Sequence, residues 1–117
     1  MVTKQNLKLY EGNTDSMTVT IGDGNEDITD YIVYFTVKAD INDADADAVI
    51  NRDVTIHSDP IHGITIIPIY PEDTKGQPPG DYPYDIRYDD GTLPLGTNIF
   101  TVVSGKIKIT QATGDLD

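Results

Sequence analysis

The most conspicuous chemical grouping in the sequence is the run of alternating aspartates in INDADADAVI. Three of them stand at the first three ligand spacings of a helix-loop-helix calcium loop. The rest of such a loop is missing, because Ala48 occupies the position that needs glycine and Val54 the position that needs a bidentate glutamate. The sequence therefore predicts no cofactor beyond a weak calcium site on Asp43, Asp45 and Asp47.

The same stretch has two other interpretations. Regular alternation could form an edge strand whose outward charges discourage pairing with other molecules. Alanine and aspartate both have poor strand propensity, however, and alanine buries little surface. We therefore favour a solvated connection over residues 40–47, which crosses between two sheets and becomes a strand only at Val49.

The histidines and carboxylates do not form a recognisable catalytic arrangement. Ser58, His57 and Asp59 could be drawn as a triad, but adjacent residues point apart and no glycine-flanked nucleophile is present. His57 follows Ile56, which is expected to point inward, so His57 should face solvent. His62 lies in a turn without further zinc ligands. Paired carboxylates for glycoside hydrolysis lack an apolar cleft to hold them. We therefore expect a protein that is not an enzyme.

The elements that must position these residues are short and rich in β-forming side chains. Ten glycines and seven prolines punctuate the 117 residues, and the runs between them are rich in Val, Ile, Thr and Tyr. No segment keeps helical spacing of apolar residues over several turns. Length and spacing predict one domain, residues 1–117, folded as an all-β sandwich or barrel.

Seven segments carry the strand pattern. They are LKLY (7–10), SMTVTI (16–21), YIVYFTVK (31–38), AVINRDVTIHS (48–58), ITIIPIY (64–70), DYPYDIRY (81–88) and residues 97–110. Pro68 cannot donate to a ladder, which predicts an edge strand or a bulge, and Gly105 suggests a bulge in the last strand. PEDTK predicts one helical turn, and DDG predicts a tight hairpin.

The charge of the chain excludes several classes of partner. Twenty acidic residues against eight basic ones give a net charge of −12. A phosphate backbone or an anionic membrane would be repelled, so we expect neither nucleic acid nor membrane binding. The absence of cysteine excludes disulfides and thiolate chemistry. The apolar runs are too short for a signal peptide or a membrane span, which indicates synthesis as a soluble protein.

PEDTKGQPPGDYPYDI is the most specific motif for the fold. A short turn after one strand leads to a tyrosine near the start of the next. In immunoglobulin-like sandwiches this arrangement is the tyrosine corner, where the hydroxyl bonds to upstream backbone. Tyr82 is the candidate. The alternative is a core aromatic residue whose hydroxyl lies at the rim.

Several motifs occur together in a recognisable order. They are LYEGNT, DITDYIVYFTVKAD, DADAVI, GITIIPIYPEDT, PPGDYPYDIRYDDG and SGKIKI. Their order resembles the short immunoglobulin-like domains of tailed-bacteriophage structural proteins, found in baseplates and tail tips. Ile107 stands where phenylalanine is usual in that family.

The resemblance implies an immunoglobulin-like antiparallel β-sandwich of about seven to eight strands. It also implies a non-enzymatic structural subunit of a virion, made in the host cytoplasm and assembled with other virion proteins as a homo- or hetero-oligomer. The family has no catalytic residues to carry over. The alternative function is a carbohydrate- or host-surface-binding module that uses exposed tyrosines.

Strand faces suggest where such an interface would lie. If Val33, Phe35 and Val37 fill the core, then Ile32 and Tyr34 face outward. The last strand offers either Ile99 with Val103 or Phe100 with Val102 to the same face, if both strands flank the strand of Tyr82. This pattern predicts an apolar interface patch on an outer sheet face. The alternative is scattered exposed apolar residues, which are common in folded proteins.

Overall fold

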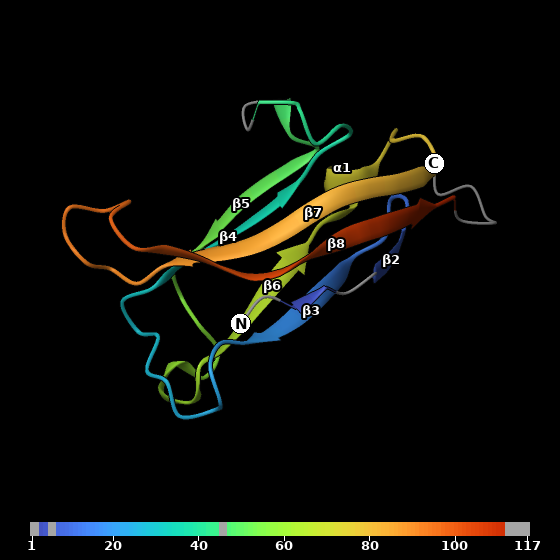
Figure 1. Cartoon of the computed structure of the whole chain (residues 1–117). Coiled ribbons are helices and arrows are strands. Elements are labelled where there is room, and N and C mark those ends of the chain that lie inside the picture. The colour runs from blue at the N-terminus through green and yellow to red at the C-terminus, as the bar shows by residue number, and fades with distance from the viewer. Residues whose placement is uncertain (1–2, 5–6, 45–46, 112–117) are drawn as a thin grey trace.

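The computed structural model describes residues 3–4, 7–44 and 47–111, which form two β-sheets packed face to face (Figure 1). Its strands are β1 (Thr3–Lys4), β2 (Leu7–Tyr10), β3 (Asp15–Thr20), β4 (Ile32–Val37), β5 (Ile50–Val54), β6 (Ile64–Ile69), β7 (Gly80–Asp89) and β8 (Ile99–Thr110). A 3₁₀ turn, η2 (Pro60–His62), precedes β6, and one helical turn, α1 (Pro71–Thr74), follows it. The predicted helical turn at PEDTK is therefore confirmed. No helix among the described residues is long and apolar enough to cross a membrane.

The strand order is that of an immunoglobulin-like sandwich. The larger sheet has the order β1-β8-β7-β4-β5, and β2 also pairs with β8; the smaller sheet is β3-β6. β7 and its two neighbours β4 and β8 pair antiparallel, whereas β1 and β2 run parallel to β8. The fold prediction is confirmed, including the placement of β4 and β8 on either side of the strand that carries Tyr82.

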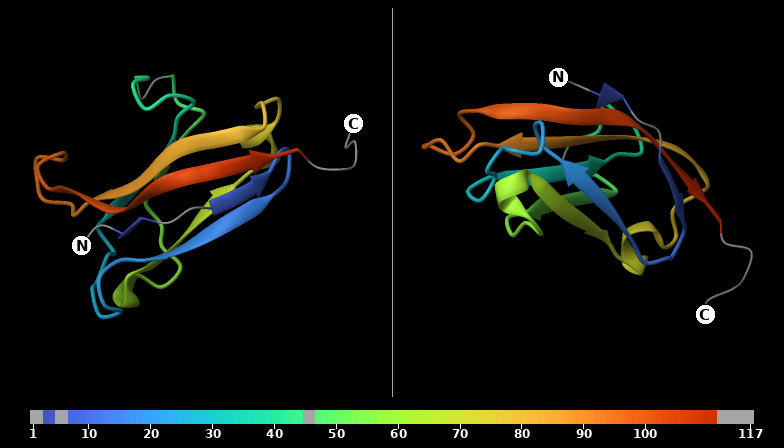
Figure 2. Two further views of the ribbon diagram at one scale, coloured as in Figure 1. Left: turned by 45° about the vertical axis from the view of Figure 1, so that its right-hand side comes forward. Right: turned by 90° about the horizontal axis from the view of Figure 1, so that it is seen from below.

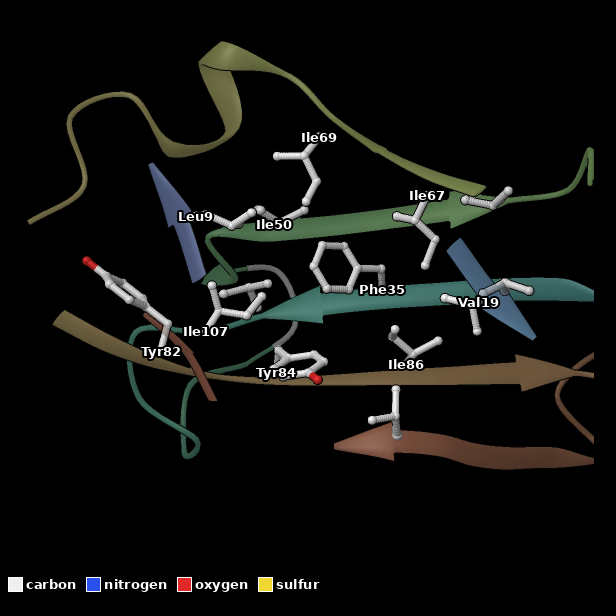
Figure 3. Close-up of a cluster of buried hydrophobic side chains, with 14 of the residues drawn as sticks. Leu9, Val19, Phe35, Ile50, Ile67, Ile69, Tyr82, Tyr84, Ile86 and Ile107 are labelled. Atoms are coloured by element: carbon white, nitrogen blue, oxygen red, sulfur yellow. The ribbon is translucent and has the colours of Figure 1, made fainter. Parts of the chain in front are cut away.

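The core lies between the two sheets (Figure 3). Period-2 alternation sends Val33, Phe35 and Val37 of β4 inward, and all three are fully buried. The Phe35 ring meets the Tyr84 ring edge-on, with centroids 6.2 Å apart. Burying an aromatic side chain of this size contributes about 2 to 3 kcal/mol, so β4 is a main contributor to the core.

A charged contact joins the two sheets beside α1. Arg52 on β5 donates to both carboxylate oxygens of Asp73, with N–O distances of 2.7 and 2.9 Å, and to the carbonyl of Pro68 at 2.9 Å. Its guanidinium also lies 4.9 Å from the centre of the Tyr70 ring. Pro68 stands on β6, whose one neighbour among the described strands is β3, so the edge position predicted for this proline is confirmed.

Two expectations around β5 were wrong. The chain leaves the sheet after Val54, so Ile56 is not an inward strand residue but is 87% exposed. The connection after β4 does not cross between the sheets, because Val37 pairs with Ile50 and β5 returns to the same sheet. Local alternation could not reveal which sheet receives a returning strand, since pairing depends on residues distant in sequence.

The bulge in β8 also lies elsewhere than expected. Gly105 pairs with Tyr84 in regular register, whereas Val102 is skipped between the pairs Ile86–Val103 and Arg87–Thr101. The DDG sequence does not form a tight hairpin either, because β7 and β8 are joined by a long loop, residues 90–98. Because of the bulge, the β8 residues between Val102 and that loop face the opposite side from the one that unbroken alternation would give them.

Candidate interaction surfaces

Three connections lie at one end of the sandwich: residues 21–31, 55–63 and 90–98 (Figures 1 and 2). We call these connections, together with Ile99 and Phe100 of β8, the loop end. Ten large apolar side chains are exposed in the described part of the chain, and six of them belong to the loop end. These six are Ile56, Ile61, Leu93, Leu95, Ile99 and Phe100. Such a concentration of exposed apolar residues is typical of a surface that contacts a partner.

The first two loops of this end are held together by buried contacts. Ile28 is fully buried and its amide donates to the carbonyl of Pro60 at 2.9 Å, while the Ile21 amide donates to the carbonyl of Gly63 at 2.8 Å. Gly63 has φ +73°, and a Cβ there would lie 2.3 Å from the Ile21 carbonyl oxygen. Only glycine therefore allows this approach of the two backbones.

The loop between β7 and β8 is organised by a buried carboxylate. Asp89 is fully buried and accepts from the amide of Gly91 at 2.9 Å and from that of Gly96 at 2.6 Å. These bonds close the loop around its tip, where Leu93 and Leu95 are 79% and 57% exposed. The loop projects beyond the sheets, so the two leucines are presented to other molecules (Figure 2).

An aromatic column connects this end to the core. The rings of Tyr31 and Tyr88 stack with centroids 5.0 Å apart, and Tyr88 contacts Phe100 at 5.2 Å. The Tyr31 hydroxyl donates to Glu26 at 2.8 Å. Burial raises the pKa of Tyr31, and the bond to Glu26 raises it further. The exposed ring of Phe100 therefore packs against Tyr88, which in turn stacks on Tyr31.

His57 is buried, contrary to the expectation that it faces solvent. Its Nε2–H donates to the carbonyl of Tyr31 at 2.8 Å, and its Nδ1 forms a hydrogen bond with the hydroxyl of Thr65 at 2.9 Å. The expectation failed because it assumed that the strand continues past Val54. The triad considered from sequence is not assembled, since Ser58 Oγ instead donates to the carbonyl of Ile64.

The loop end is acidic throughout. Residues 21–31, 55–63 and 90–98 contain no lysine or arginine. Their six carboxylates belong to Asp23, Glu26, Asp27, Asp30, Asp59 and Asp90. Hydrogen bonds from the side chain and amide of Thr29 lower the pKa of Asp27, and those from Thr92 lower the pKa of Asp90. The three loops therefore carry acidic side chains and no lysine or arginine.

The outer face of the larger sheet carries a groove of about 870 Å³. It is lined by Thr36, Lys38, Ile41, Pro83, Tyr84, Asp85, Arg87, Ser104, Gly105 and Lys106. Three of these residues are cationic and one is a carboxylate, which lies 3.7 Å from the Nε of Arg87. The groove thus has a net charge of +2 on a chain whose net charge is −12. Ile41, 74% exposed, adds an apolar wall.

The continuous apolar patch predicted around Ile32 and Tyr34 is not formed as expected. Both are half-buried, and their neighbours across β7 are the charged Asp89 and Arg87. Val103 is buried in the core while Ile99 is exposed, and Val102 packs against the core while Phe100 is exposed, so neither pair expected from β8 lies together on the outer face. A role of Ile32 and Tyr34 in an interface stays a prediction.

Tyr82 lies at the start of β7 and is 7% exposed. Its hydroxyl donates to the carbonyl of Pro78, four residues upstream, at 2.6 Å. This is the backbone contact that the tyrosine-corner interpretation requires. Burial raises the pKa of Tyr82.

The aspartate stretch places Asp43 and Asp47 in the connection between β4 and β5, while Asp45 lies outside the described residues. Asp43 bonds locally: its carboxylate accepts from the amide of Asp40 at 3.2 Å, and its own amide donates to the Asp40 carbonyl. Within the part of the chain that the structure describes, no group of three or more acidic or histidine residues could hold a metal. Calcium binding here stays a prediction.

Comparison with family models and with curated proteins gave no match. Among solved structures, an uncharacterized protein from Bacillus anthracis str. Ames is 20% identical, with a TM-score of 0.41 over 89% of this chain and 77% of that one. A chain of the crystal structure of ICOS in complex with ICOS-L and an anti ICOS-L VNAR domain is 11% identical. Its TM-score is 0.50, over 95% of this chain and 56% of that chain. The second likeness supports the immunoglobulin-like β-sandwich fold.

Proposed function

We propose that the protein is a non-enzymatic structural subunit of a tailed-phage virion, in the tail or baseplate, and that it acts through protein–protein contacts. The observation that supports an assembly role is the loop end, where six exposed apolar side chains lie on loops anchored by buried groups or at the start of β8. The phage context rests on the order of motifs along the sequence.

The physical case for a binding end is its preorganisation. Ordering a loop on binding costs free energy, and loops that are already fixed avoid most of that cost. Here the buried Ile28 joins loops 21–31 and 55–63, and the carboxylate of Asp89 orders loop 90–98, in the chain without a partner. Clustered apolar side chains then supply the desolvation that dominates binding at the centre of an interface.

The direct test is mass spectrometry of purified virions. We expect the wild-type protein to be present in a fixed stoichiometry, and its absence from virions would refute the structural role. Leu93→Asp combined with Leu95→Asp should melt like the wild type but fail to enter particles. Ile66→Asp, a change at another exposed apolar residue outside the loop end, is the matched control and should enter normally. Normal entry of the double variant would exclude this loop as the contact.

A glycan-binding module is the second candidate function, and one observation favours it. Phe100 is 47% exposed and is backed by the stacked rings of Tyr88 and Tyr31. An aromatic face supported in this way can stack on a sugar ring. Glycan-array binding that is lost in Phe100→Ala, with no change in melting, would support this function over assembly.

A further inference from the structure

We infer that Asp23 is a site of spontaneous covalent modification, at which the peptide between Asp23 and Gly24 rearranges to isoaspartate, and that the fold protects the same dipeptide at Asp90 and Gly91. Aspartate followed by glycine occurs at these two places in the sequence. Both lie in the loop end, one in loop 21–31 and the other in loop 90–98. This chemistry belongs to the chain itself and does not depend on the proposed function.

The rearrangement needs only the peptide and water. The amide nitrogen that follows an aspartate loses its proton and attacks the side-chain carboxyl carbon, so that a C–N bond forms and one carboxyl oxygen leaves as water. The product is a succinimide ring. Water then adds to one of the two ring carbonyls: opening at the original peptide bond gives isoaspartate, and opening at the new bond restores aspartate. Water is released in the first step and consumed in the second, and no atom is oxidised or reduced. Glycine favours the attack because it has no Cβ beside the nitrogen.

At Asp23 the structure leaves the reacting groups free. The side chain is exposed, and its Oδ1 accepts from the amide of Asn25 at 3.1 Å, which folds the carboxyl group over Gly24. Among residues 3–4, 7–44 and 47–111, no hydrogen bond engages the amide of Gly24. Gly24 has φ +93°, and a Cβ placed there would meet no atom within 4 Å. The backbone therefore has room to turn its nitrogen toward the carboxyl carbon.

At Asp90 the fold engages both reacting groups. The nucleophilic amide of Gly91 donates instead to the buried carboxylate of Asp89 at 2.9 Å. The carboxylate of Asp90 accepts from the amide of Thr92 at 2.9 Å and from the side-chain amide of Asn98 at 3.2 Å. Hydrogen bonds from Thr92 lower the pKa of Asp90, so less of this carboxyl group is in the protonated form, which is the better electrophile. The reaction at Asp90 therefore requires the loop to open first.

Peptide mapping of the folded full chain tests the inference. Trypsin releases the two sites on separate peptides, residues 9–38 for Asp23 and residues 88–106 for Asp90. After incubation in mildly acidic buffer, isoaspartate is located by fragmentation spectra and by labelling with isoaspartyl methyltransferase and isotopically labelled S-adenosylmethionine. We expect isoaspartate to accumulate in residues 9–38 at least about tenfold faster than in residues 88–106, because the second site reacts only from an opened loop. Equal rates in the two peptides, or no isoaspartate in residues 9–38, would overturn the inference.

Two controls accompany the measurement. In denaturing urea the rates in the two peptides should agree to within about threefold, because unfolding breaks the bonds that protect Asp90. A contrast that persists in urea would assign it to local sequence and refute protection by the fold. Asp23→Glu is a matched change at an exposed position, and its longer side chain closes the corresponding ring far more slowly. This variant should melt like the wild type and lose the labelling of residues 9–38. Labelling that persists would place the isoaspartate at another residue of that peptide and contradict the assignment to Asp23.

Discussion

Replacing Arg52 by methionine should remove the contact that ties the larger sheet to α1. The methionine keeps an apolar stem of similar length, so the change isolates the guanidinium. That group makes two bonds to Asp73, at 2.7 and 2.9 Å, and one to the carbonyl of Pro68 at 2.9 Å. It also lies over the ring of Tyr70.

The magnitude follows from the partial burial of the pair. The Arg52 and Asp73 side chains are 21% and 11% exposed, so their hydrogen bonds are only weakly screened by water. Charge-assisted hydrogen bonds contribute about 1.5 to 3 kcal/mol each before screening, and the cation–π contact adds about 0.5 to 1 kcal/mol. These contributions are not additive, because the bonds share one guanidinium and one carboxylate. We therefore expect the free energy of unfolding to fall by about 2 to 3 kcal/mol, which lowers Tm by roughly 8 to 12 °C for a domain of this size.

A double-mutant cycle with Asp73→Asn separates the pair from its surroundings. Asparagine retains an acceptor for the amide of Tyr70, which Asp73 binds at 2.7 Å, but it loses the charge. Urea denaturation of the two single variants and the double variant should give a coupling energy of about 1 to 2 kcal/mol. Effects that add to within about 0.3 kcal/mol would show that the pair does not act as a unit and would refute the reasoning.

The pH dependence of the same contact has a definite sign. Burial raises the pKa of Asp73, but the bonds from Arg52 and from the Tyr70 amide outweigh burial and hold the pKa below its usual value. A carboxylate with a depressed folded pKa stabilises the protein above its unfolded pKa of about 4, and this stabilisation is lost as pH falls through the folded value. The stability difference between wild type and Asp73→Asn should therefore shrink below about pH 4. A difference that stays constant down to pH 2 would contradict the assignment.

Three further changes test other parts of the molecule. Tyr82→Phe should keep the fold and lower the free energy of unfolding by about 1 kcal/mol, the net contribution of one buried hydrogen bond; an unchanged denaturation midpoint would remove the tyrosine corner. Gly63→Ala should cost about 2 kcal/mol or more in thermal melts, because a Cβ at φ +73° meets the Ile21 carbonyl; a stabilised variant would show that this turn relaxes freely. Millimolar calcium should raise Tm no more than ordinary salt of the same ionic strength does; a calcium-specific rise that is lost in Asp45→Asn would establish a metal site in the aspartate stretch.

Local sequence patterns predicted most of the strands and the role of particular residues within them. Alternation in YIVYFTVK placed Val33, Phe35 and Val37 inward, because neighbouring side chains of a strand point to opposite faces whatever the strand pairs with. The pattern around Tyr82 indicated an immunoglobulin-like sandwich because the corner is built from a short contiguous segment. The proline of β6 marked an edge for a similarly local reason, the missing amide hydrogen.

The interaction surfaces depend on pairings between distant residues, so the sequence alone could not place them. The bulge at Val102 exposes Ile99 while Val103 enters the core, and the pairing of β8 with β7 decides its position. His57 is buried because its chain leaves the sheet early and meets Tyr31 and Thr65. The composition determined that the chain is strongly acidic. Only the tertiary structure gathered cations in one groove and apolar side chains at one end, because strand order brings together residues that no local pattern relates.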